Sequence, residues 1–186
     1  MPSLKLFMLI LGCRPPKRLT EQHDIFFGIG YELKDLLPDM FEFWPEAKQQ
    51  IHLDAWREVN HVDGYDIKII SRQDEKPDEK TKLFFINLGG YKPGDFEEYH
   101  YKMLVAAHDK GAAIKKSKQT AFYKHMGFEG AVSHIDDKYG VDVDDMHEIK
   151  DILPQSIKKQ YSIQLTLAAN IREDELHIGY FPLSKL

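Results

Sequence analysis

Two short pairs of polar residues in this sequence have the composition of a metal-binding or acid–base site. Glu21 and His23 are two residues apart, and so are His52 and Asp54. On a β-strand, residues i and i+2 point to the same face, so the members of each pair would lie side by side. Imidazole and carboxylate groups bind divalent metals and transfer protons near neutral pH.

The same pair types recur later in the chain, which doubles the number of candidates. The candidate catalytic residues are Glu21, His23, His52, Asp54, Glu98, His100, His134 and Asp136. The histidines and aspartates of this set are the candidate metal ligands: His23, His52, Asp54, His100, His134 and Asp136. A structural role competes with both functions, because buried polar side chains often tie down a neighbouring loop through backbone hydrogen bonds.

Strand alternation argues against convergence of the two pairs and favours the structural role. Glu21 and His23 would share a face with apolar Ile25, whereas His52 and Asp54 would face away from apolar Leu53. If apolar residues mark the buried face of each strand, the two pairs point to different environments.

The recurrence of these pairs belongs to a longer repeat, which indicates an internal duplication. Residues 5–23 and 82–100 align without a gap and are identical at 8 of 19 positions. Residues 52–70 and 134–152 are identical at 7 of 19 positions, and this second alignment matches the two His-x-Asp pairs. A period of about 80 residues exceeds that of solenoid repeats, so we predict two copies of one small unit.

Composition sets the predicted boundaries of the two copies. Unit one would span residues 1–72, and the charged segment 73–81 would be a linker. Unit two would span residues 82–186 and would include two additional C-terminal strands.

Each copy is predicted to begin with a buried strand. Leu6–Leu11 and Leu83–Leu88 are continuous apolar runs that end at a glycine, as central strands do. A second strand follows, because two glycines in Asp24–Gly30 disfavour a helix there. A helix comes next, beginning near Tyr31 in unit one and after the expected N-cap Asp109 in unit two.

The later elements complete the predicted fold. They are the strand Gln50–Val59, the turn Asp63-Gly64 and the strand Tyr65–Ser71 in unit one, and the strand Gly130–Asp136, the turn Val141–Asp145 and the segment Met146–Leu153 in unit two. Tyr161–Leu167 and Leu176–Leu183 are predicted to close the chain as strands. The predicted fold class is α+β, an internally duplicated ββαββ unit with a mainly antiparallel sheet and pseudo-twofold symmetry.

Over most of its length the chain resembles an uncharacterised bacterial family of domains of unknown function, which carry one or two copies of such a unit. The resemblance rests on the segments KLFMLILGC, EQHD, IHLDAWREV and SHIDDKYGVDVDD. It implies a bacterial, cytoplasmic origin, and it carries no established activity.

Composition narrows the classes of function. The net charge of −5 gives no general attraction to nucleic acid or to an anionic membrane. The single cysteine fits a reducing compartment, and no apolar stretch approaches membrane-spanning length. We therefore expect a small cytoplasmic protein without a membrane partner.

Three functions are compatible with these features. The first, which the sequence favours, is a binding or regulatory protein without catalysis, in which the Glu-x-His and His-x-Asp pairs are mainly structural and the ligand would be a small molecule. The second is a metal-assisted or acid–base enzyme that acts on a small polar substrate through the Glu-x-His and His-x-Asp pairs. No cofactor is predicted from the sequence, although these pairs are compatible with a divalent metal. The third is a nucleic-acid-associated protein that uses the basic patch Lys110–Lys124, which the negative net charge disfavours.

Apolar residues near the end of the chain predict a homodimer. Ile178, Tyr180 and Phe181 lie on the last predicted strand, where an unpaired sheet edge is expected. Phe41, Phe43 and Trp44, within residues 31–47, form a second candidate patch. The competing explanation is that these aromatic residues cover the core.

Overall fold

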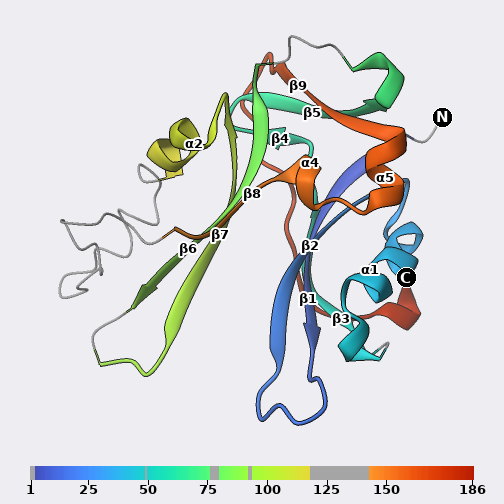
Figure 1. The fold of residues 1–186 in the computed structure, drawn as a ribbon, viewed down its shortest axis with the longest axis vertical. Coiled ribbons are helices and arrows are strands. Elements are labelled where there is room, and N and C mark those ends of the chain that lie inside the picture. Colours follow the sequence, from blue (N-terminus) through green and yellow to red (C-terminus); the bar gives the residue numbers. More distant parts are fainter. Residues whose placement is uncertain (1–2, 49, 76–79, 92–93, 118–142) are drawn as a thin grey trace. The chain divides into compact units, whose positions relative to one another are not determined.

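The computed structural model describes residues 3–48, 50–75, 80–91, 94–117 and 143–186 of the chain. The chain forms two compact units. Unit 1 consists of Met1–Pro77 together with Ile152–Leu186, and unit 2 consists of Asp78–Asp151. The structure is α+β, as predicted, with helices beside antiparallel sheets (Figure 1).

Unit 1 contains a four-stranded antiparallel sheet of order β10-β3-β1-β2. Its strands are β1 (Lys5–Cys13), β2 (Gln22–Gly30), β3 (His52–Glu58) and β10 (His177–Pro182). β1 lies inside this sheet, so its backbone is paired on both sides. The continuous apolar run in β1 therefore predicted its position correctly.

Helical segments cover one face of this sheet. They are η1 (Leu33–Leu36), α1 (Leu37–Phe43) and η2 (Pro45–Ala47). Leu36 and Met40 are fully buried in one core with Leu9 and Leu11 of β1. α1 ends at Phe43 because Pro45 disfavours a helical conformation at the residue before it. The aromatic patch predicted as a dimer surface packs largely on this core, through Phe41 and Trp44.

A second sheet of unit 1 has the order β4-β5-β9. It consists of β4 (His61–Val62), β5 (Tyr65–Ser71) and β9 (Tyr161–Leu167). Four further short helices are η3 (Arg72–Asp74), α4 (Ile149–Ile152), α5 (Gln155–Gln160) and η4 (Leu183–Lys185). Asp63 and Gly64 both have positive φ, 54° and 82°, between β4 and β5. This is the tight hairpin turn that the Asp-Gly dipeptide predicted.

Unit 2 is built on a three-stranded sheet of order β7-β6-β8, with β6 (Lys82–Tyr91), β7 (Glu98–Ala107) and β8 (Val143–Glu148). The helix α2 (Lys110–Ser117) follows β7. The N–H of Ala112 donates to Asp109 Oδ1 at 2.8 Å, which makes Asp109 the predicted N-cap. Ala113 of α2 is buried with Phe84 and Val105 of the sheet.

The sheet of unit 2 has the same register as β2-β1-β3 of unit 1. Gly12 of β1 pairs with His23 of β2, and Gly89 of β6 pairs with His100 of β7. An ion pair joins Lys82 to Glu148, at the register position of the pair between Lys5 and Glu58 in unit 1. β3 and β8 also carry an irregularity at the same place in the pairing, between Leu53 and Ala55 in β3.

Two sequence-based assignments differ from the structure. The closing strands were assigned to unit two, but β9 pairs with β5 and β10 pairs with β3, so both belong to unit 1. Residues 143–145, the described part of the segment predicted as a turn, instead begin the strand β8, because their backbone pairs with β6. The predicted strand Gly130–Asp136 lies outside the described residues.

Candidate functional site

Gly12 lies at the centre of the candidate site in unit 1. The side chains of Leu11 and Cys13 point into the core beneath α1, so residue 12 faces the other side of the sheet. The register places His23 beside Gly12 on one neighbouring strand and His52 beside it on the other. The polar side chains therefore meet above a residue that has no side chain of its own.

Glu21, His23, His52 and Asp54 form a ring, which we call site 1. His23 Nε2 lies 3.2 Å from Asp54 Oδ2 and 3.8 Å from Glu21 Oε2. His52 Nε2 lies 3.2 Å from Glu21 Oε1 and 3.5 Å from Asp54 Oδ2. Each imidazole thus contacts both carboxylates, and each carboxylate contacts both imidazoles. The argument from strand alternation is wrong for these four residues, because the structure brings them together.

A backbone irregularity places Asp54 in site 1. Leu53 pairs with Leu11 and Ala55 pairs with Ile10, so Asp54 is an extra residue in the ladder. Such a bulge redirects a side chain without ending the strand. Asp54 Oδ2 is buried and has no hydrogen-bond partner in the described part of the chain, although both imidazole nitrogens lie near it.

Site 1 is closed on one side and open on the other. The His52 side chain is 11% exposed, and its ring centroid lies 4.7 Å from that of Tyr180 on β10. The side chains of His23 and Glu21 are 43% and 46% exposed. An ion or a small molecule could therefore reach the ring from the side of β2.

The spacing along the sides of site 1 suits a metal ion. Metal bonds of about 2.0–2.1 Å in a tetrahedral site place neighbouring ligand atoms about 3.3 Å apart. The four sides of site 1 measure 3.2–3.8 Å. Among the described residues, no three ligand atoms of site 1 all lie within 4.8 Å of one another, whereas those of Glu98, His100 and Asp144 in unit 2 do. An ion at site 1 would therefore require the opposite side chains to move closer together.

The side chains of site 1 do not make the contacts expected of residues that hold a loop in place through hydrogen bonds to its backbone. Among the described residues, the four side chains have no hydrogen bond to loop backbone, and their ion pairs are with one another. The structural role that the sequence favoured requires such backbone bonds.

Unit 2 holds a related cluster, which we call site 2. The ligand atoms of Glu98, His100 and Asp144 all lie within 4.8 Å of one another. By register Asp144 corresponds to Asp54, so the alignment that matched Asp54 with Asp136 is out of register. His134 and Asp136 lie outside the described residues. Asp144 is the site residue that sequence reasoning missed. Glu148 could have identified it, because Glu148 lies four residues after Asp144, just as Glu58 lies four residues after Asp54.

The lone cysteine is not part of site 1. Cys13 is buried in the core beneath α1. Burial raises the pKa of its thiol, and the negative charge of Glu21 raises this pKa further. A thiol with a raised pKa is a poor nucleophile near neutral pH, so Cys13 packs as a small apolar residue.

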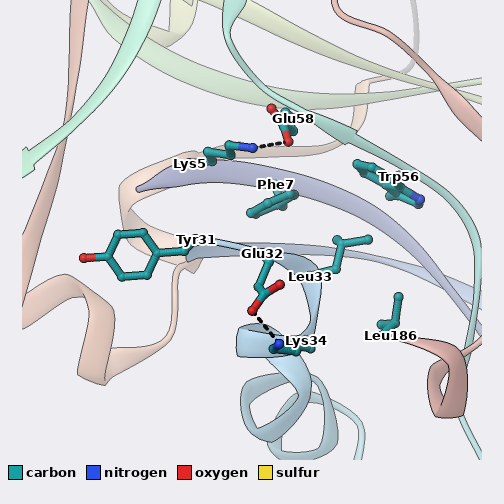
Figure 2. Close-up of a pocket in the computed structure, with 9 residues that line it drawn as sticks. All are labelled: Lys5, Phe7, Tyr31, Glu32, Leu33, Lys34, Trp56, Glu58 and Leu186. Atoms are coloured by element: carbon teal, nitrogen blue, oxygen red, sulfur yellow. Dashed lines mark hydrogen bonds and ion pairs between the residues drawn. The ribbon is translucent and has the colours of Figure 1, made fainter. Parts of the chain in front are cut away.

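Two pockets open on unit 1. A pocket of about 320 Å³ lies between η1 and β3, where Lys5 pairs with Glu58 and Lys34 pairs with Glu32 (Figure 2). Its charged side chains are thus paired with one another, and its remaining lining residues are Phe7, Tyr31, Leu33, Trp56 and Leu186. A second pocket of about 670 Å³ includes His23 of site 1, and its other lining residues are Pro15, Pro16, Arg18, Gln22, Asp24, Trp44, Glu46 and Lys48.

In the described residues, no helix is long and apolar enough to cross a membrane. The basic patch Lys110–Lys124 is described only as far as Ser117, within α2.

Comparisons with known proteins relate the chain to uncharacterised relatives. Residues 18–69 match the model of the family Domain of Unknown Function (DUF1543), and this segment contains all four residues of site 1. The match confirms, for this segment, the resemblance to a family of domains of unknown function.

A crystal structure of a protein Il1583 from Idiomarina loihiensis has a TM-score of 0.66 and 24% sequence identity to this chain. The match covers 97% of this chain and 98% of that one, and at this identity it shows a shared fold alone. No curated protein matches the chain. The function of the chain is unknown, so the geometry of the site has to carry the argument.

Proposed function

We propose that this protein binds a divalent metal ion at site 1. The observation that supports this proposal is the alternating ring of two imidazoles and two carboxylates above Gly12. Nitrogen ligands favour ions such as Zn²⁺ over Mg²⁺ and Ca²⁺, which prefer oxygen. The proposal keeps the protein in the binding class that the sequence favoured and gives its Glu-x-His and His-x-Asp pairs a function.

Zinc titration of the purified full chain tests this proposal. Wild-type protein is expected to bind Zn²⁺ at site 1, and replacing both His23 and His52 by alanine is expected to weaken that binding at least about 100-fold. Calorimetry against a chelator of known affinity measures the loss, and Mg²⁺ serves as the comparison ion.

His61→Ala is the matched control for this experiment. His61 also pairs with a carboxylate, Asp66, at 2.8 Å, but it lies on β4, away from site 1. This variant should bind zinc as wild type does. Equal zinc binding by the double variant and wild type, or no zinc binding by wild type, would overturn the proposal.

Catalysis at the same ring is a second candidate function. His23 lines the pocket of about 670 Å³, in which Arg18 and Lys48 could hold an anionic group. A metal ion that keeps an open coordination position polarises a bound molecule or activates a water. The substrate would be the small polar molecule that the sequence analysis considered.

We also propose an internal duplication and a cytoplasmic location in a bacterium. The matching registers of β2-β1-β3 and β7-β6-β8 support the duplication. The single, buried Cys13 supports a reducing compartment. The resemblance to a bacterial family supports the origin.

A homodimer formed through β10 is a further part of the proposal. β10 is an edge strand of its sheet, and Ile178 and Tyr180 on it are 76% and 67% exposed. Ile178→Lys is therefore expected to convert a dimer into a single chain in sedimentation experiments at low micromolar concentration. Phe181 is unsuitable for this test because it packs on the core. Wild-type protein that sediments as a single chain would refute the dimer.

A further inference from the structure

We infer that site 2 is a second divalent-cation site, which differs from site 1 in its donor atoms and prefers a harder ion such as Mn²⁺. Its ligands are Glu98, His100 and Asp144, whose ligand atoms all lie within 4.8 Å of one another. It is thus the more tightly gathered of the two clusters, and it goes beyond the metal binding proposed for unit 1.

The backbone of unit 2 leaves room for this cluster in the same way as in unit 1. His100 pairs across the ladder with Gly89, and Asp144 is the extra residue of β8 between Val143 and Asp145. A Cβ atom built on Gly89 would overlap the carboxylate of Asp144. Gly89 does not have a positive φ, so what this position needs from glycine is the missing side chain.

The contacts of His100 engage both of its ring nitrogens. Nε2 lies 3.6 Å from Glu98 Oε2, and Nδ1 lies 3.3 Å from Asp144 Oδ2. His100 therefore links the two carboxylates of the cluster.

Asn87 adds a second, independent feature to site 2. It is 9% exposed and occupies the register position of Ile10 in unit 1. Its Nδ2 lies 3.1 Å from His100 Nδ1 and donates to Asp145 Oδ2 at 3.4 Å, and its Oδ1 is buried without a hydrogen-bond partner in the described part of the chain. Because Nδ2 is the atom that donates to Asp145, the buried Oδ1 remains an oxygen acceptor beside the cluster.

The donor set explains why the two sites should differ in the ion that they prefer. Site 1 has two imidazoles and two carboxylates, whereas the described part of site 2 has one imidazole, two carboxylates and a neighbouring amide. Carboxylate and carbonyl oxygens suit harder ions such as Mn²⁺, and imidazoles suit Zn²⁺. We therefore expect site 2 to favour Mn²⁺ relative to site 1.

Titration of the full chain with Mn²⁺, followed by electron paramagnetic resonance of the free ion, tests the inference. Asp144→Asn and His100→Gln are each expected to weaken Mn²⁺ binding at least about tenfold. Glu97→Gln is the matched control, because it removes an equal charge from the residue next to Glu98 and should leave binding unchanged. Far-ultraviolet circular dichroism checks that each variant keeps its secondary structure.

The His23 and His52 double variant separates this inference from the proposed function. If the double variant keeps Mn²⁺ binding while Asp144→Asn loses it, the assignment of site 2 is supported, independently of whether site 1 binds zinc. If Asp144→Asn and His100→Gln bind Mn²⁺ as wild type does, or wild type does not bind Mn²⁺, the inference is overturned. A site 1 that binds zinc would survive that result.

Discussion

Replacing Gly12 by alanine is expected to abolish metal binding at site 1 while leaving the fold of unit 1 intact. A Cβ atom at residue 12 would overlap His52 Nε2 and Asp54 Oδ2, closer than real Cβ atoms come to other atoms. Gly12 does not have a positive φ, so alanine fits the backbone without strain. The clash falls on the ends of side chains, which can rotate away, and their rotation opens the ring.

Zinc calorimetry and thermal unfolding of the Gly12→Ala variant measure the two halves of this prediction. Zinc affinity should fall at least about 100-fold, whereas the free energy of unfolding should change by about 1 kcal/mol or less. Gly89→Ala is the reciprocal control, because it should disturb Asp144 in unit 2 and spare zinc binding at site 1. Unchanged zinc binding by Gly12→Ala would show that the ring above this residue is not the binding site.

Leu9→Ala is expected to cause the largest loss of stability in unit 1, about 3–5 kcal/mol. Leu9 is completely buried at the centre of β1, where it packs in one core with Leu36 and Met40. Truncation removes apolar contacts and leaves a cavity that helices on one side and a paired strand on each side cannot fill. A loss of this size is a large part of the stability of an ordinary domain.

Urea unfolding, followed by circular dichroism, measures this effect. Leu19→Ala is the matched control, because the same chemical change is made at a side chain that is 95% exposed. Its free energy of unfolding should differ from that of wild type by less than about 0.5 kcal/mol. Equal losses in the two variants would contradict the core position of Leu9.

The strands were predictable from sequence where their patterns are local. The apolar run of β1, the alternation of β9 and the Asp63-Gly64 turn each depend on neighbours in the chain, and the structure has all three. The partner of each closing strand was not predictable. The partner of β9 is β5, from which it is separated by all of unit 2.

The convergence at site 1 was missed for a specific physical reason. Alternation was interpreted as if only one face of each strand were buried, but neighbouring Phe26 and Phe27 of β2 are 3% and 2% exposed. When both faces are covered, an apolar neighbour no longer tells which way a histidine points. The extra residue at Asp54 adds a second error, because a bulge has no simple sequence signal.

The aspartate of the cluster in unit 2 was assigned to the wrong residue because the alignment followed sequence identity instead of strand register. The alignment matched His52 with His134 and Asp54 with Asp136, whereas β-ladder pairing makes Asp144 the counterpart of Asp54. Short repeats of histidine and aspartate match at several offsets in a charged segment. Strand register distinguishes these offsets better than sequence identity does. In unit 2 it is marked by the ion pair between Lys82 and Glu148.

Unit 1 is built from two separate segments of the chain, and this affects the order in which the protein folds during translation. The free edges of β3 and β5 emerge early, but the strands that cover them, β10 and β9, are translated only after unit 2. At about 5–20 residues per second, roughly 100 intervening residues leave those edges bare for roughly 5–20 s. The inserted unit, whose strands pair within one continuous stretch, is complete first. Unit 2 therefore completes its sheet before unit 1 completes its two sheets.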